Sequence, residues 1–198
     1  VEHLACLVSS DGLITDRDEC RAYETDALAV YRRIPLAVVL PTSTDEVSAV
    51  LKFCHDNGVK VVPRGAGTSL AGGAIPTEDA IVLGLSRMSR VLEINYDDRF
   101  IRVEAGVTNL SITSAVSDRG FFYAPDPSSQ LACTIGGNIA NNSGGAHCLK
   151  YGVTTNNLLG IRLVLIDGTI LDLGGNSLDS GGLDLLGVVV GSEGQLGI

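Results

Sequence analysis

The sequence predicts an α+β fold of two lobes. Before about residue 90, a strand-like apolar run, a helical pattern and a second strand-like run follow one another, as in a βαβ unit. Beyond that point apolar and polar residues alternate, which is typical of antiparallel hairpins with one solvent-facing side. We place a lead-in at residues 1–35, a small βαβ lobe at 36–90 and a larger, mostly antiparallel lobe with helices at 91–198.

The first lobe contains one well-marked helix. Ser43 and Glu46 have capping-box spacing, apolar residues follow at helical intervals, and Gly58 is placed to end the helix. Short apolar runs on either side of the helix predict strands. Because strands joined by a crossover helix run in the same direction, we expect them to be parallel. Three strands are expected, at Leu36–Leu40, Val59–Val62 and Ile81–Leu83.

The second lobe shows hairpin signals. Asp167-Gly168 is a strong two-residue turn, and Asn109 is placed to cap a helix that runs to about Arg119 and ends at Gly120. Strands are expected at Val91–Ile94, 101–105, Ile161–Ile166, Thr169–Leu173 and Leu186–Val190.

Composition excludes several classes of function. The net charge of −9 argues against nucleic-acid binding, because no basic stripe is present. No apolar run approaches the roughly 18 residues of a membrane span, and no signal-peptide pattern occurs at the N-terminus. Five cysteines without CxxC spacing indicate a reduced, cytoplasmic protein. The spacing of Cys133, His147 and Cys148 matches no familiar zinc pattern, so no metal is expected.

The loop Pro63–Ala74, PRGAGTSLAGGA, has the features of a phosphate cradle. Glycines let the backbone approach a ligand closely, and successive N–H groups form an anion site. A merely flexible surface loop is the alternative. Neither common nucleotide motif fits: Leu70 interrupts the dinucleotide fingerprint, and Gly73 and Ala74 replace the essential Lys and Ser/Thr of a P-loop.

A second polar loop spans residues 126–145, DPSSQLACTIGGNIANNSGG. Its carboxamides and glycine amides offer many hydrogen-bond donors and acceptors, which suits a ligand with ring nitrogens, carbonyls and phosphate. Asparagine and glycine also favour turns on their own account, so a plain turn region is the alternative. Two such loops in one chain favour a long, polar cofactor.

Five stretches in order carry a family resemblance: PRGAGTSLAGG, VEAGV, APDPSSQLACTIGGNIANNSGG, YGVTTNNLLGIRLVLIDGTIL and GSEGQLGI. From about Leu36 to its end, the chain resembles the PCMH-type FAD-binding domain of the vanillyl-alcohol oxidase superfamily. Within it, the chain is most similar to the FAD-linked subunit of glycolate oxidase and related D-2-hydroxyacid (D-lactate) dehydrogenases.

The resemblance implies roles for matching residues. The residues implied to hold the FAD pyrophosphate are Arg64, Gly65, Ala66, Gly67, Thr68, Ser69, Gly72 and Gly73. The residues implied to approach the nucleotide or flavin side are Pro125, Asp126 and Ser128. The residues implied to line the flavin and ribityl region are Thr134, Gly137, Asn138, Asn142, Ser143 and Gly145, and Tyr151 and Gly152 would continue this wall. Gly194 and Ile198 would close over the cofactor with backbone groups.

The resemblance also predicts noncovalent FAD and an incomplete enzyme. Covalently flavinylated relatives carry histidine where this chain has Thr68, which cannot form that bond. The chain begins at Val1 and stops at Ile198, so we expect a piece of a longer protein whose substrate domain lies beyond it. Among the histidines, His147 follows the second loop, but a structural role is favoured, and no catalytic residue is assigned.

The function implied is the FAD-binding portion of a 2-hydroxyacid dehydrogenase that oxidises glycolate or D-lactate to the 2-oxo acid by hydride transfer to FAD. A second flavin subunit and an iron–sulfur subunit are implied partners. Two alternatives stay open: an FAD-dependent oxidoreductase of the same fold acting on a sugar lactone or a cell-wall precursor, and a flavin-free interaction module.

Overall fold

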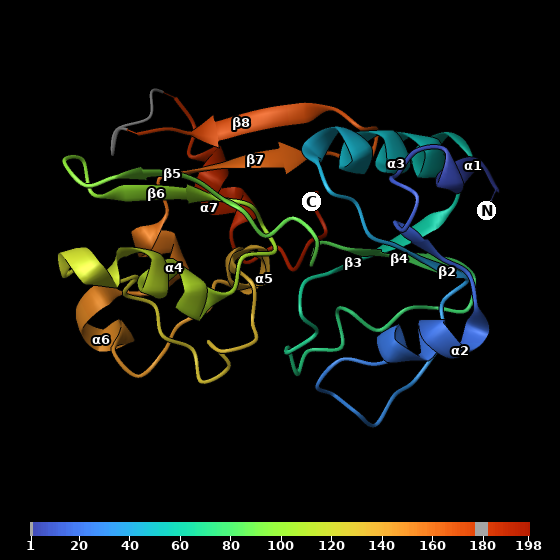
Figure 1. The fold of residues 1–198 in the computed structure, drawn as a ribbon, viewed down its shortest axis with the longest axis horizontal. Coiled ribbons are helices and arrows are strands. Elements are labelled where there is room, and N and C mark those ends of the chain that lie inside the picture. The colour runs from blue at the N-terminus through green and yellow to red at the C-terminus, as the bar shows by residue number, and fades with distance from the viewer. Residues whose placement is uncertain (1, 177–181) are drawn as a thin grey trace. The chain divides into compact units, whose positions relative to one another are not determined.

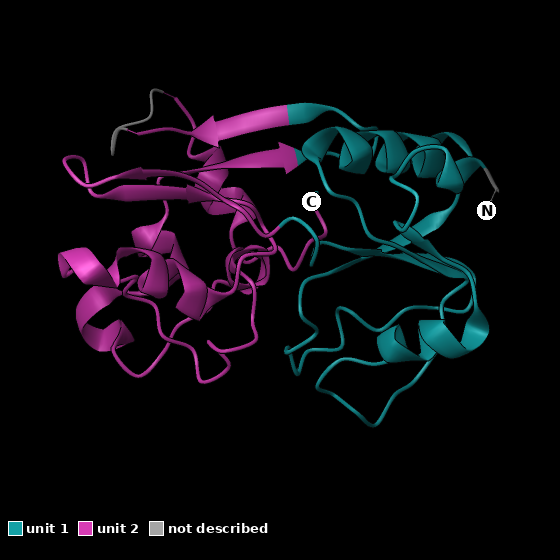
Figure 2. Cartoon of the chain, viewed as in Figure 1, with its two compact units in different colours: residues 1–88, 164–170, 197–198 teal, residues 89–163, 171–196 magenta. Residues whose placement is uncertain are grey.

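The structure, a computed structural model, describes residues 2–176 and 182–198. The chain divides into two compact units (Figure 2). Unit 1 comprises residues 1–88, 164–170 and 197–198, and unit 2 comprises residues 89–163 and 171–196. The mixture of a mainly parallel sheet with antiparallel pairs confirms the predicted α+β class.

Unit 1 is built on a four-stranded sheet of order β1-β2-β4-β3 (Figure 1). The strands are β1 (Leu13–Ile14), β2 (Ala37–Val39), β3 (Lys60–Arg64) and β4 (Ala80–Gly84). Both β2 and β3 pair in parallel with β4, which lies between them, whereas β1 pairs antiparallel with β2. The three predicted strands and their parallel direction are confirmed. The edge strand β1 was not predicted, because two residues carry no readable alternation.

Helices lie on opposite sides of this sheet (Figure 1). One side carries α3 (Thr44–Asp56), whose buried stripe is Val47, Val50, Leu51 and Cys54. The other side carries α2 (Arg17–Cys20), continued by η1 (Arg21–Tyr23). There Cys20 packs with Val38 and Val82, which are paired in register. The short helix α1 (Glu2–Ala5) completes the N-terminal segment.

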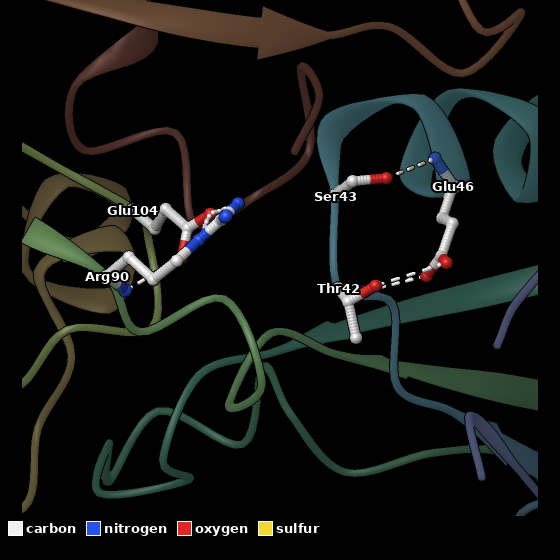
Figure 3. Close-up of polar contacts among 5 residues, drawn as sticks. All are labelled: Thr42, Ser43, Glu46, Arg90 and Glu104. Atoms are coloured by element: carbon white, nitrogen blue, oxygen red, sulfur yellow. Dashed lines mark hydrogen bonds and ion pairs between the residues drawn. The ribbon is translucent and has the colours of Figure 1, made fainter. Parts of the chain in front are cut away.

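The start of α3 follows the predicted cap with one difference (Figure 3). The Ser43 hydroxyl accepts a hydrogen bond from the Glu46 N–H at 3.2 Å, as expected. The Glu46 carboxylate does not reach back to Ser43 but accepts from the N–H of Thr42 at 2.7 Å and from its hydroxyl at 3.1 Å. At the other end, Gly58 has φ +65°, the left-handed conformation expected just past a helix.

Unit 2 opens with the predicted hairpin, β5 (Val91–Asn95) and β6 (Phe100–Val103), paired antiparallel. The N-terminal side of the hairpin is fixed by Arg90, whose guanidinium donates to Glu104 at 2.6 and 3.0 Å and whose backbone N–H donates to the same carboxylate at 2.7 Å (Figure 3). The Glu104 side chain is only 6% exposed.

Helix α4 (Asn109–Val116) continues as η2 (Ser117–Arg119) and ends at Gly120 with φ +75°, as predicted. Its predicted cap is wrong by one residue. Thr108 is the N-cap and accepts from the Ser111 N–H, while Asn109 is already helical and 1% exposed. Threonine and asparagine are both good caps, so sequence preference did not separate the two positions.

The rest of unit 2 holds α5 (Ile135–Asn141), α6 (Cys148–Tyr151), η3 (Thr154–Asn157) and α7 (Leu185–Val189). The hairpin β7 (Gly160–Val164) and β8 (Ile170–Gly174) is confirmed, and its turn, residues 165–169, belongs to unit 1. The predicted strand Leu186–Val190 is wrong, because α7 forms there with Asp184 accepting from the Gly187 N–H. An apolar run this short is compatible with the apolar spacing of a helix and with that of a buried strand, so the sequence alone does not separate the two.

Among residues 2–176 and 182–198, no helix has the length and apolar character needed to cross a membrane.

Candidate functional site

In unit 1 the loop after β3 wraps around the side chain of Arg64. Gly67, at φ +69°, lies so close to this side chain that a Cβ atom there would clash with Arg64 Nη2. Arg64 Nη1 donates to the carbonyl of Thr25 at 2.7 Å and more weakly to that of Ala74 at 3.5 Å. The guanidinium therefore lies directly against the loop backbone.

The charge of Arg64 is incompletely balanced. Burial lowers the pKa of Arg64, while the charges of Asp26 and Tyr23 act in the opposite direction. No hydrogen bond joins the Arg64 guanidinium to the Asp26 carboxylate in the described part of the chain. Because a guanidinium stays protonated at neutral pH, a partly buried cation lies next to Gly67.

The backbone of the same loop has free hydrogen-bond donors. Within residues 2–176 and 182–198, the N–H groups of residues 65–70 find no acceptor, although Ala71 N–H donates to the Ser69 hydroxyl. The Thr68 side chain is half-buried and likewise without a described partner. Unpaired N–H groups in a loop that also contacts a cation are donors of the kind that a diphosphate requires, so residues 64–73 fit the pyrophosphate of FAD.

In unit 2 the second loop is closed by an Asp–His pair. The Asp126 carboxylate contacts His147 Nδ1 at 2.5 Å and accepts from the His147 backbone N–H at 3.2 Å. These hydrogen bonds lower the pKa of Asp126. Gly145 comes so near Asp126 that a Cβ atom would clash with it. The His147 side chain is 68% exposed, and its pairing ties the two ends of the loop together.

A buried amide network underlies the same loop. Asn109 Nδ2 donates to the Pro125 carbonyl at 3.0 Å and to Asn138 Oδ1 at 2.9 Å. Asn138 Nδ2 donates to Cys133 Sγ at 3.2 Å. Asn109 and Asn138 are 1% and 2% exposed, so both carboxamides bond to protein groups. Sequence reasoning missed Asn109 as a site residue, since it was expected only as a cap.

The remaining candidates mostly shape the backbone of unit 2. Thr134 caps α5, and Asn142, in the left-handed conformation, accepts from the N–H and hydroxyl of Thr155. The Ser143 carbonyl accepts from the N–H and hydroxyl of Thr154, which is fully buried. Ser128 is exposed, and Tyr151 and Gly152 end α6. Gly194 has φ +77°. Ile198 belongs to unit 1, where its backbone forms hydrogen bonds with that of Val164.

Apart from Gly194 and Ile198, the site residues thus fall into two groups. Residues 64–73 form a cradle in unit 1, and residues 125–152 form one connected loop system in unit 2. Their roles in contacting FAD stay predictions.

The glycine loop against Arg64 is a feature expected of a domain that binds an anionic cofactor. Residues 35–174 match the protein family described as "FAD binding domain". This match covers most of the chain, which therefore belongs to the FAD binding domain family.

Curated relatives share much of the sequence. The glycolate oxidase subunit GlcD of Escherichia coli (strain K12) is 52% identical over 181 residues, which is 91% of this chain and 36% of that protein. A D-lactate dehydrogenase of Archaeoglobus fulgidus is 42% identical over 183 residues, again 91% of this chain and 41% of the relative. The chain thus spans well under half of the length of these relatives.

The fold recurs in a solved structure. An alkyldihydroxyacetonephosphate synthase superposes with a TM-score of 0.87 over 100% of this chain and 38% of that one. The two sequences are 23% identical, so this likeness concerns the fold alone. It agrees with the PCMH-type FAD-binding fold expected from the sequence motifs.

Proposed function

We propose that this chain is the FAD-binding portion of a flavin-dependent 2-hydroxyacid dehydrogenase of the glycolate oxidase type. Its relatives include a glycolate oxidase subunit and a D-lactate dehydrogenase, so glycolate and D-lactate are the substrates proposed. FAD would supply the acceptor for a hydride equivalent from the substrate α-carbon. The protein would bind, orient and shield the cofactor.

The observation that carries this proposal is the position of Arg64 against Gly67. In the described residues the partly buried Arg64 guanidinium donates hydrogen bonds to carbonyl groups and to no carboxylate, and the loop N–H groups at residues 65–70 have no protein acceptor. A diphosphate would satisfy both. Residues 64–73 are accordingly the proposed pyrophosphate site, and residues 125–152 the proposed flavin and ribityl site.

Thr68 supports dissociable rather than covalent flavin, because its hydroxyl is not the group that attaches flavin in covalently modified relatives. We further propose that the substrate pocket needs residues outside this chain, since the relatives are far longer. The chain alone should therefore bind FAD but turn over little glycolate or D-lactate.

Flavin absorbance tests the proposal first. The purified chain, incubated with FAD and desalted, should retain a yellow flavin spectrum, whereas retention of none would contradict FAD binding and favour a flavin-free module. Anaerobic mixing of a full-length protein containing this chain with glycolate, D-lactate or L-lactate then tests the substrate. Bleaching by a sugar lactone but by no hydroxyacid would point to another oxidoreductase of the same fold.

A second flavin subunit, an iron–sulfur subunit and a cytoplasmic location complete the proposal. The two partner subunits are testable by affinity purification of a tagged full-length protein from its own cells, with bound iron and flavin measured per chain. Recovery of the tagged chain alone under gentle conditions would contradict the complex.

A further inference from the structure

We propose that the segment 23–28, which lies in the N-terminal lead-in, is part of the cofactor site and holds Arg64 in place for the diphosphate. The segment precedes the family match, which begins at residue 35. The inference rests on the FAD binding proposed above. It assigns a role to residues whose sequence carried no readable signal.

The first contacts are made to Arg64 itself. The Tyr23 ring lies against the guanidinium, with 5.6 Å between its centroid and Arg64 Cζ. Two residues on, the Thr25 carbonyl accepts the short 2.7 Å hydrogen bond from Arg64 Nη1. A cation–π contact and a charge-assisted hydrogen bond together limit where the guanidinium can move.

Further contacts reach the glycine loop. The Ala27 N–H donates to the Ser69 carbonyl at 3.2 Å. A Cβ atom at Gly72 would lie 3.5 Å from Leu28 Cδ2, so this side chain borders the far end of the loop. The segment therefore runs alongside the loop from Arg64 to Gly72.

Asp26 supplies the charge at the centre of the segment. It is 5% exposed, and its Oδ1 accepts from the Leu28 N–H at 2.8 Å, which fixes the turn. Its Oδ2 is buried without a hydrogen-bond partner in the described chain. A carboxylate left partly unpaired is costly, and attraction to the Arg64 charge is the interaction available to offset that cost.

Tyr23 is the positioning residue that can be tested cleanly. Its ring packs on the cluster of Cys20, Val38 and Val82 and so connects the core of unit 1 to the guanidinium. Losing the ring would remove one of the two contacts that limit where the guanidinium can move. Ile34 packs on the same cluster, and its aliphatic side chain can form neither a cation–π contact nor a hydrogen bond with Arg64.

The experiment measures FAD dissociation constants and melting temperatures for the whole chain and three variants. Tyr23→Leu should weaken FAD binding about five- to tenfold, because the cation–π contact is lost. Tyr23→Phe keeps the aromatic face and should stay within about twofold of wild type. Ile34→Ala should lower the melting temperature through lost packing yet leave FAD affinity within about twofold.

The pattern among the variants decides the outcome. If Tyr23→Leu weakens FAD binding no more than Ile34→Ala, or if Tyr23→Phe loses as much as Tyr23→Leu, the proposed role of the ring is overturned.

Hydrogen exchange of the wild-type chain gives a second readout that needs no variant. FAD should slow amide exchange in residues 23–28 as well as in 64–75. Protection of 64–75 alone overturns the role of the segment while leaving the proposed function intact. Absence of FAD binding by a folded wild-type chain overturns both.

Discussion

Arg64 Nη2 lies where a side chain at position 67 would have to be, so any residue larger than glycine there would force the Arg64 guanidinium to move. The left-handed φ of +69° at Gly67 independently favours glycine. Together they place a cation against a backbone with unpaired N–H groups. This relationship is the structural basis of the proposed diphosphate site.

Replacing Gly67 by alanine tests that relationship. Gly67→Ala should weaken FAD binding at least about tenfold, because the new methyl group displaces the guanidinium, and should cost about 1 kcal/mol of stability from the left-handed backbone. Gly58→Ala is the matched control, since Gly58 has φ +65° but nothing within 4 Å of a Cβ atom. It should lose similar stability while FAD affinity, followed by calorimetry, stays unchanged. Equal FAD affinity in both variants would contradict the prediction.

The buried amide network predicts a large stability effect at Asn109. Asn109→Leu removes the amide donor of the Pro125 carbonyl and of Asn138 Oδ1, and we expect a loss of about 2–4 kcal/mol in urea unfolding. Asn141→Ala is the comparison: Asn141 is exposed and donates only to the Gly137 carbonyl, so the change should stay within about 0.5 kcal/mol. Similar losses for both would mean that the network adds little.

Acid stability should depend on Glu104. Burial raises the pKa of this carboxyl, but hydrogen bonds from the side chain and backbone of Arg90 outweigh it and hold the pKa below the usual 4.5. The ionised carboxylate is therefore favoured by folding. Its contribution is fully present above the unfolded pKa and is lost as the pH falls through the lower folded pKa.

Urea midpoints measured between about pH 6 and pH 3 check this dependence. Wild type should lose stability over that interval, and Glu104→Gln should be less stable at pH 6 but lose less on acidification. An identical pH dependence in the two proteins would show that another group controls acid unfolding.

The parts of the fold that the sequence predicted are those with strong local patterns. The buried stripe of α3, the apolar runs of β2 and β4 and the Asp167-Gly168 turn each carry a period or turn signal within a few residues. By contrast, the α7 segment is a short apolar run whose pattern is compatible with either a helix or a strand, and the sequence predicts a strand there.

The candidate site was predictable in composition but not in its internal contacts. Glycine and asparagine content marked both loops, because backbone freedom and carboxamide donors are local properties. The contacts that hold the loops are not local: Arg64 meets Thr25 at a separation of 39 residues, and Asn109 meets Asn138 at 29. No spacing rule connects residues so far apart in sequence, so Tyr23 and Asn109 emerge only from the structure.

Acid precipitation of the FAD-loaded chain tests whether FAD binds noncovalently in the Arg64–Gly67 cradle. After desalting and precipitation, the flavin should appear in the supernatant as intact FAD, close to one per chain, and Gly67→Ala should carry much less through desalting. Flavin that stays with the precipitated protein would contradict dissociable binding, and a folded wild-type chain that retains no flavin before precipitation would contradict the cradle itself.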